Sequence, residues 1–136
     1  METLINFAGR LLLAHIFVIS GLIKISGFAA TQAYMSSKGV PGALLPLAIL
    51  LEVGGGFAII TGFMTRWVSF ALALFCVVSG LLFHLDLGDQ SQNIHLMKNL
   101  AMAGGFLILA QTGTPFWSVD AMLAFRAVEK NGVKIG

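Results

Sequence analysis

Six polar side chains stand inside otherwise apolar stretches of this sequence, and their types are suited to proton transfer and ligand binding. They are Arg10, Lys24, Glu52, His84, Lys98 and Asn99. An ionisable group inside a membrane span is costly unless it is paired or hydrated, so each of them is a candidate functional residue. Carboxylate and imidazole groups exchange protons, whereas cationic and amide groups donate hydrogen bonds. We therefore predict that Glu52 and His84 are catalytic and that the other four bind a ligand.

Helical periodicity places two of these residues on one face of the first apolar stretch. Arg10 and Lys24 are separated by steps of four and three residues, so we expect both to point into one groove. The small residues Ala14 and Gly21 lie between them on that face and allow another helix to approach closely. His15 is about 140° away from Arg10, at about 100° per residue, and is the weaker candidate.

Glu52 lies beside the three glycines of residues 54–56 in the second apolar stretch. On a helix it shares a face with two of them and with Ile59, which indicates a close helix contact or a ligand lying against the backbone. Two roles are open for this carboxylate. An ion pair with Arg10 or Lys24 would fix the packing of the bundle, and a proton acceptor would serve a ligand head group. The two roles are not exclusive.

Other candidates also have a purely structural interpretation. His84 would cap carbonyls at a helix end, and Lys24 and Lys98 would extend to lipid head groups. Haem is disfavoured because its two axial ligands must lie at matched depth, and His15 and His84 do not. No cluster of His, Cys, Asp and Glu has the spacing of metal ligands, so no metal site is predicted. The single cysteine, Cys76, excludes an internal disulfide or a dithiol pair.

The elements that position these residues must lie in lipid. Of the 136 residues, 57% are hydrophobic and 10% are charged, and the mean hydropathy is +0.91. Soluble domains carry about 25% charged residues. This composition excludes a disordered chain, a nucleic-acid-binding module and a water-soluble enzyme. We predict an integral membrane protein.

Four apolar stretches are long enough to cross a bilayer, which takes about 20 residues of helix. They are residues 4–26, 42–63, 66–85 and 95–112. The connecting segment 27–41 has room for a short interfacial helix, and residues 116–131 predict an amphipathic helix with Ser118 as its N-cap. The predicted fold is therefore all-α, a single membrane domain over residues 1–136. It is an integral membrane four-helix bundle with a C-terminal interfacial amphipathic helix.

Lysine and arginine flank the predicted spans unequally. Three lie on the side of the 27–41 segment, and five lie on the other: Arg10, Arg66, Arg126, Lys130 and Lys134. Because cytoplasmic loops carry the excess of positive charge, both termini are predicted to lie in the cytoplasm.

Several segments, in their order, carry a family resemblance. They are GRLLLAHIFVISGLIKISGF at 9–28, GVPGALLPLAILLEVGGGFAIITGFMTRW at 39–67, FH at 83–84, MKNLAMAGGFLILA at 97–110 and SVD at 118–120. Together they resemble the DoxX family of small bacterial inner-membrane proteins, in particular its DoxX/YphA-like branch, over roughly residues 4–123. The resemblance implies recurring polar positions at the six residues named above. It also implies membrane oxidoreductase partners, since related proteins include the small subunit of a thiosulfate:quinone oxidoreductase.

We accordingly expect a quinone-interacting or electron-transfer subunit of a membrane oxidoreductase complex in the bacterial inner membrane, with a quinone as the candidate cofactor. The ring would lie in a groove between the first, second and fourth helices. Glu52 would exchange a proton there, and Lys24, His84 and Lys98 would donate hydrogen bonds. Whether the chain is an enzyme by itself is left open.

The expected partners are the lipid bilayer, a redox protein and a second copy of the chain packed through glycine-rich faces. A net charge of +2 is too small to indicate nucleic acid. One alternative function is a non-enzymatic scaffold, assembly or stress-related factor whose buried charges only fix the bundle packing. Another is a small-solute carrier, which would need oligomerisation to enclose a path.

Overall fold

A computed structural model describes residues 1–114 and 116–130, and these form helices joined by short turns, with no strand among them. The elements are α1 (Glu2–Ser26), α2 (Phe28–Ser37), η1 (Gly42–Leu44), α3 (Leu45–Ile49), η2 (Leu50–Gly54), α4 (Gly55–Thr61), α5 (Thr65–His84), α6 (Gln90–Thr112) and α7 (Val119–Lys130). Position 131 of the predicted tail helix and Lys134 of the charge comparison lie outside the described residues. The predicted all-helical fold is confirmed.

Within the described ranges, three helices are long and apolar enough to cross a membrane: α1, the continuous run Gly42–Thr61, and α5. They match the first three predicted spans to within a few residues. The helix that contains the fourth predicted span, α6, is long enough but is not among the three, since residues 90–99 at its start are mostly polar. Many large apolar side chains on these helices are exposed, as expected of surfaces that face lipid.

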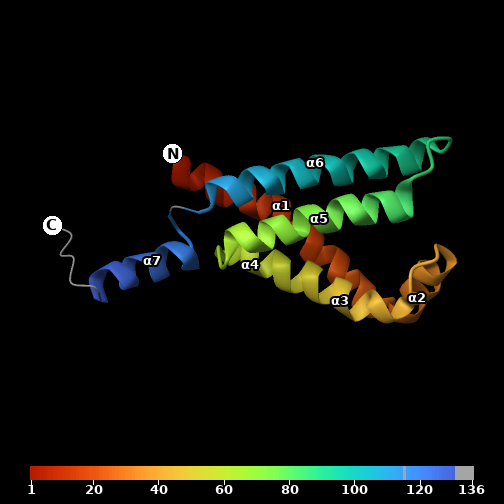
Figure 1. Ribbon diagram of the computed structural model, residues 1–136, viewed down its shortest axis with the longest axis horizontal. Coiled ribbons are helices and arrows are strands. Elements are labelled where there is room, and N and C mark those ends of the chain that lie inside the picture. The colour runs from red at the N-terminus through yellow and green to blue at the C-terminus, as the bar shows by residue number, and fades with distance from the viewer. Residues whose placement is uncertain (115, 131–136) are drawn as a thin grey trace.

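The long helices pack as two pairs around a common core (Figure 1). The first pair is α5 and α6, which run antiparallel side by side, and the second is α1 with the run from α3 to α4. The shared core contains Ala14, Phe17, Ile59, Leu72, Ala73, Cys76, Ala103, Phe106 and Leu109. All four long helical runs therefore contribute to one core.

The predicted buried face of α1 is confirmed: its buried residues are Arg10, Ala14, Phe17 and Gly21. Two glycines set how closely α1 and the second helical run approach. A Cβ atom on Gly21 would lie 2.5 Å from Val53 Cγ2, and one on Gly56 would lie 2.6 Å from Val18 Cγ2. Neither position has room for a larger residue unless the valine side chain or a helix shifts.

The two short predicted helices are both present. The connecting helix, α2, lies between α1 and η1 at one end of the bundle. At the other end, Ser118 Oγ accepts the amide of Ala121 at 3.1 Å, which confirms this serine as the N-cap of α7. Beyond that cap, α7 extends past the end of the long helices (Figure 1). Its location at a membrane interface stays a prediction.

Candidate functional site

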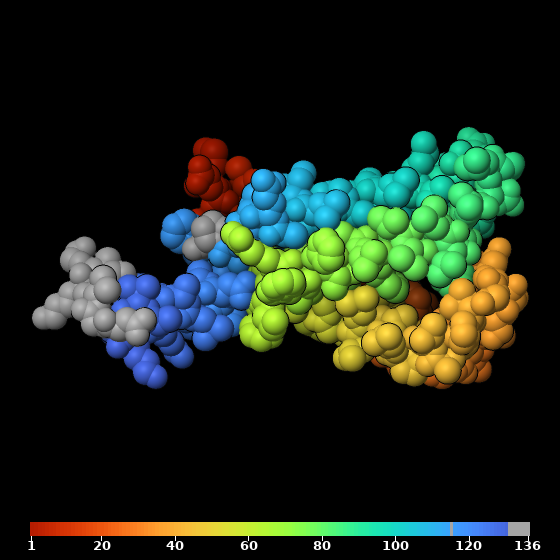
Figure 2. Space-filling view, in the orientation of Figure 1, coloured from red at the N-terminus to blue at the C-terminus, as the bar shows by residue number. Residues whose placement is uncertain are grey.

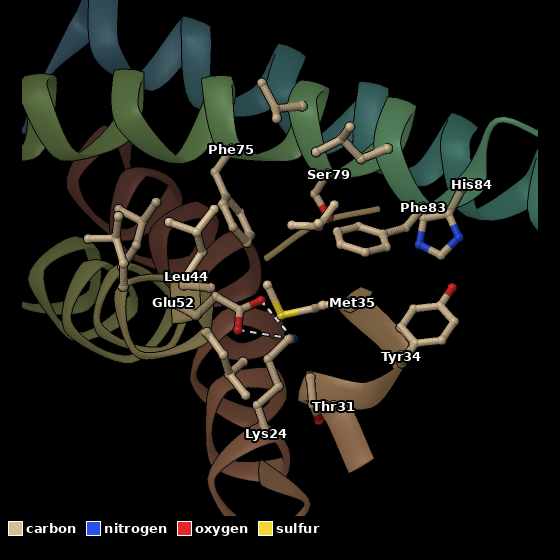
Figure 3. Close-up of a pocket in the computed structure, with 17 residues that line it drawn as sticks. Lys24, Thr31, Tyr34, Met35, Leu44, Glu52, Phe75, Ser79, Phe83 and His84 are labelled. Carbon is tan, nitrogen blue, oxygen red and sulfur yellow. Dashed lines mark hydrogen bonds and ion pairs between the residues drawn. The ribbon is translucent and has the colours of Figure 1, made fainter. Parts of the chain in front are cut away.

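A pocket of about 440 Å³ opens between α5 and the segment formed by α2 and α3. It lies at the end of the bundle remote from α7, where the surface is hollowed between these elements (Figure 2). Most of its lining is apolar, and the aromatic rings of Tyr34, Phe75 and Phe83 form part of its wall together with Met35 (Figure 3). The pocket is thus suited to a flat apolar molecule rather than to an ion.

Glu52 forms a buried ion pair with Lys24 on the pocket wall. Lys24 Nζ lies 3.0 Å from Oε1 and 3.0 Å from Oε2 of the carboxylate (Figure 3). The Glu52 side chain is 5% exposed and the Lys24 side chain 27%, so the cation is the more accessible partner. Of the two ion pairs that the sequence left open, this one forms within the described residues.

The two oxygens of this carboxylate are bonded differently. Oε1 accepts hydrogen bonds from Lys24 Nζ and from Ser20 Oγ, the latter at 3.3 Å. Oε2 is buried and, although it lies close to Nζ, it accepts no hydrogen bond from the described part of the chain. Both oxygens nevertheless lie 3.0 Å from the ammonium group of Lys24, which compensates the charge of the carboxylate.

The backbone around Glu52 is a π-helical turn, η2, inserted between the α-helical segments α3 and α4. Such turns shift the register of the side chains that follow by one residue, and they are frequent at functional sites. The adjoining Gly55 and Gly56 are buried against neighbouring helices. The wide turn and the glycines together let Glu52 sit at the crossing with α1 and still border the pocket.

His84 lies at the mouth of the pocket, at the last residue of α5. Its Nδ1 is 2.7 Å from Gln92 Oε1, and its ring stacks on His95 at 5.0 Å between centroids. Beside it, the rings of Tyr34 and Phe83 stack at 5.7 Å, so α2 contacts α5 directly there. The first two turns of α6 therefore hold His84 in place without themselves lining the pocket.

Arg10 lies at the opposite end of the bundle. It is 14 residues from Lys24 on α1, which corresponds to about 21 Å along a helix. Its guanidinium is buried and donates to the carbonyl of Ile60 at 3.2 Å and to that of Trp117 at 2.7 Å. The expected groove shared by Arg10 and Lys24 is not formed, because one helix face can carry two residues to different ends of the molecule.

Lys98 and Asn99 do not line the pocket either. Lys98 is exposed on α6, and Asn99 donates its side-chain amide to the carbonyl of His95 at 3.1 Å. The predicted groove between the first, second and fourth helices is therefore corrected: the pocket is bordered by α5 instead of α6. The physical reason is that α6 packs along the other side of α5.

The sequence interpretation missed the residues of α2 that line the pocket, above all Tyr34 and Met35. Their signal was the adjacent pair of large side chains in the segment 27–41, which has room for a short helix. It also missed Asp120, whose carboxylate accepts the amides of Met64 and Thr65 at 2.7 and 2.8 Å and so caps α5 from α7.

Among the described residues, no three His, Cys, Asp or Glu side chains are grouped so that they could hold a metal ion. Cys76 is free and buried in the core. A ligand of this chain would therefore use the pocket beside Glu52, and its polar contacts there would come from Lys24, Glu52 and His84.

Comparison with known proteins identifies the relatives of this chain. It is 46% identical over 114 residues to inner membrane protein YqjF of Escherichia coli (strain K12), which covers 84% of this chain and 88% of that protein. It is 34% identical over 118 residues to inner membrane protein YphA of the same organism, covering 82% and 84%. No solved structure matches the chain. The DoxX family model matches residues 5–85, and with its three apolar helices this chain is a small membrane protein that belongs to the DoxX family.

Proposed function

We propose that this protein binds a lipid-soluble quinone in the pocket beside Glu52 and serves as a quinone-interacting subunit of a membrane oxidoreductase complex. The observation that carries the proposal is an apolar, aromatic-lined pocket with a single buried ion pair on its wall. Sites for small molecules and cofactors have this composition, with a few placed polar groups in an apolar cleft of about 300–1,000 Å³. The volume of about 440 Å³ lies within that range.

The residues present fit such a ring. Tyr34, Phe75 and Phe83 offer aromatic faces, and offset or edge contacts between rings are favourable. When bound, a quinone supplies a couple that takes up or releases electrons together with protons. In this chain Glu52 would hold a proton at the inner wall, and His84 would exchange a proton at the mouth. Because Cys76 is the single cysteine, the electrons would come from a partner protein rather than from a dithiol.

We also propose that α6 is a fourth span and that both termini lie in the cytoplasm of a bacterial inner membrane. Support comes from Arg10 and Asp120, which connect the chain after α6 to the beginning of the bundle. Asp120 bonds to the turn between α4 and α5, and Arg10 of α1 bonds to Trp117. If α6 did not cross the bilayer, Trp117 and Asp120 would lie on the opposite side of the membrane from Arg10 and the turn between α4 and α5. The contacts between them could then not form.

A second candidate function is a non-enzymatic scaffold, assembly or stress-related factor. It is favoured by the observation that the buried charges already have partners in the protein: Glu52 has Lys24, and Arg10 has two carbonyls. Charges used in this way would fix how the helices pack.

The two functions are separated by extracting the total quinone and quinol that co-purify with the detergent-solubilised protein. We expect a near-stoichiometric amount in the parent, none in Glu52→Gln, and an unchanged amount in Lys98→Gln, whose side chain lies outside the pocket. Circular dichroism and gel filtration show whether each variant is folded. Absence of quinone from the parent would contradict the proposal and favour the scaffold.

A further inference from the structure

The two helical runs that border the pocket diverge along its length. α4 packs against α5, and its first residue, Gly55, is so close that an added Cβ would lie 3.2 Å from Leu72 Cδ2. The preceding segment, α3, has few or no contacts with α5 and turns away from it (Figure 1). The pocket occupies the space between the separated parts. It is therefore a wedge whose narrow end is at α4.

Both edges of this wedge carry apolar side chains that line the pocket and are also exposed on the surface. Leu47 of α3 is 63% exposed, and Val78 and Leu82 of α5 are 45% and 49% exposed. The run Gly42–Thr61 and α5 are apolar and long enough to cross a membrane, so exposed apolar side chains on them contact lipid tails. The pocket thus has a side opening, between Leu47 on one edge and Val78 and Leu82 on the other, that faces the hydrocarbon of the bilayer.

The mouth of the pocket beside His84 has a different character. Tyr34 of α2 stacks on Phe83 there at 5.7 Å, and Lys38 Nζ lies 5.9 Å from the centre of the Tyr34 ring. α2 therefore contacts α5 across this end of the pocket, with polar groups beside the contact. A proton can pass such a mouth, but a long apolar chain there would be exposed to water, which is unfavourable.

The volume of the pocket limits how much of a ligand it encloses. About 440 Å³ lies in the lower part of the range of about 300–1,000 Å³ that is usual for small-molecule sites. This space accommodates a substituted ring but not a long isoprenoid chain as well. The chain of a ligand whose ring is bound must therefore leave the pocket, and only an apolar surrounding is favourable for it. The side opening provides that surrounding.

We propose that the ligand enters from the bilayer through the side opening, and that its chain then lies between Leu47 and Val78 with the ring inside the pocket. This inference rests on the proposed quinone site and adds the class of ligand, a ring with a long apolar chain, and its path. Leu47 and Val78 then determine specificity for the chain, and proton exchange is confined to the mouth beside His84.

A photoreactive probe tests the path in the parent protein, reconstituted into phospholipid vesicles. The probe is a benzoquinone whose decyl chain carries a diazirine close to the ring, and mass spectrometry locates the residues that it labels. Lipid-facing residues are labelled even without a site, so the signal is the labelling that an excess of long-chain quinone without the diazirine removes. We expect this competed labelling at Leu47, Val78 and Leu82.

Val78→Trp places a larger side chain at the side opening. Leu74→Trp is the matched control, because Leu74 is exposed one turn earlier on the same helix and does not line the pocket. We expect Val78→Trp to weaken binding of the decyl benzoquinone about 10-fold, because the added volume occupies the space of the chain. Leu74→Trp should bind as the parent does.

The outcomes separate this inference from the proposed function. Competed labelling at Thr31 and Tyr34 of α2 in place of the side opening would overturn the entry from the bilayer and leave the quinone site standing. Equal binding by Val78→Trp and Leu74→Trp would also contradict the side opening. Absence of any competed labelling would overturn the proposed function itself. Because the labelling is measured in the parent protein, it decides the matter even if Val78→Trp does not fold.

Discussion

At the scale of single residues, the buried carboxylate of Glu52 needs a compensating charge whatever else it does. Lys24 supplies it at 3.0 Å and lies about four turns along α1 from the buried cation Arg10. A buried charge without a partner lowers stability by much more than a matched ion pair raises it. We therefore expect a large coupling free energy between Lys24 and Glu52.

We predict that Lys24→Met destabilises the protein by about 3 kcal/mol, because it leaves Glu52 as a buried charge without a partner. The double variant Lys24→Met with Glu52→Leu should regain most of that loss, since it removes both charges together. Thermal unfolding in detergent of the parent, both single variants and the double variant gives the coupling free energy. Losses that simply add would show that the pair is not coupled.

How far these residues could be predicted from the sequence depends on what decides their position. Periodicity correctly placed Arg10 on the buried face of α1, because that depends only on helix geometry. It could not show that Arg10 binds the carbonyls of Ile60 and Trp117, since those groups reach it from distant parts of the chain. Nor could it show that Lys24, and not Arg10, forms the ion pair with Glu52.

At the scale of elements, the crossing of α1 with the run from η2 to α4 fixes the wall of the pocket. The crossing is close because glycines lie where the helices meet, and Gly56 contacts α1 while the nearby Gly54 does not. Gly54 and Gly56 lie in the same helical run but in different surroundings, so Gly54 can serve as the control for a substitution at Gly56.

We expect Gly56→Ala to destabilise the protein by about 1–3 kcal/mol, because the added Cβ would lie 2.6 Å from Val18 Cγ2 and 3.3 Å from the carbonyl oxygen of Ala14. Gly54→Ala is the control. Its Cβ would meet only Leu50 Cδ1, at 3.7 Å, and the change favours helix by up to about 1 kcal/mol. Thermal unfolding in detergent compares them, and equal effects would show that the close crossing is not a constraint.

Hydropathy predicted these elements well and their arrangement less well. The first three spans and α2 follow from apolar length and from the segment 27–41. The π-helical turn at Glu52 depends on a change in backbone hydrogen-bond register, which no residue type in Leu50–Gly54 announces. The sequence could not show that α5, and not α6, borders the pocket. That depends on which side of α5 is covered by α6.

At the scale of the whole molecule, the number of bilayer crossings determines on which side of the membrane α7 lies. Hydropathy alone finds three candidates, and the proposed fourth crossing is supported by the contacts of Asp120 with Met64 and Thr65. The polar start of α6 is compatible with a crossing. His95 stacks on His84 at the end of the bundle, and the later, apolar turns of α6 contribute Phe106 to the core.

Labelling of introduced cysteines in intact cells tests this topology, and Cys76 gives little background because it is buried. We expect Leu87→Cys, in the turn between α5 and α6, to react with a membrane-impermeant maleimide. Met64→Cys and Lys130→Cys should react only after the inner membrane is permeabilised, because both lie on the predicted cytoplasmic side. A reversed pattern would invert the orientation. Opposite labelling of Met64→Cys and Lys130→Cys would mean that α6 does not cross, and the contacts of Asp120 with the α5 start would then be excluded.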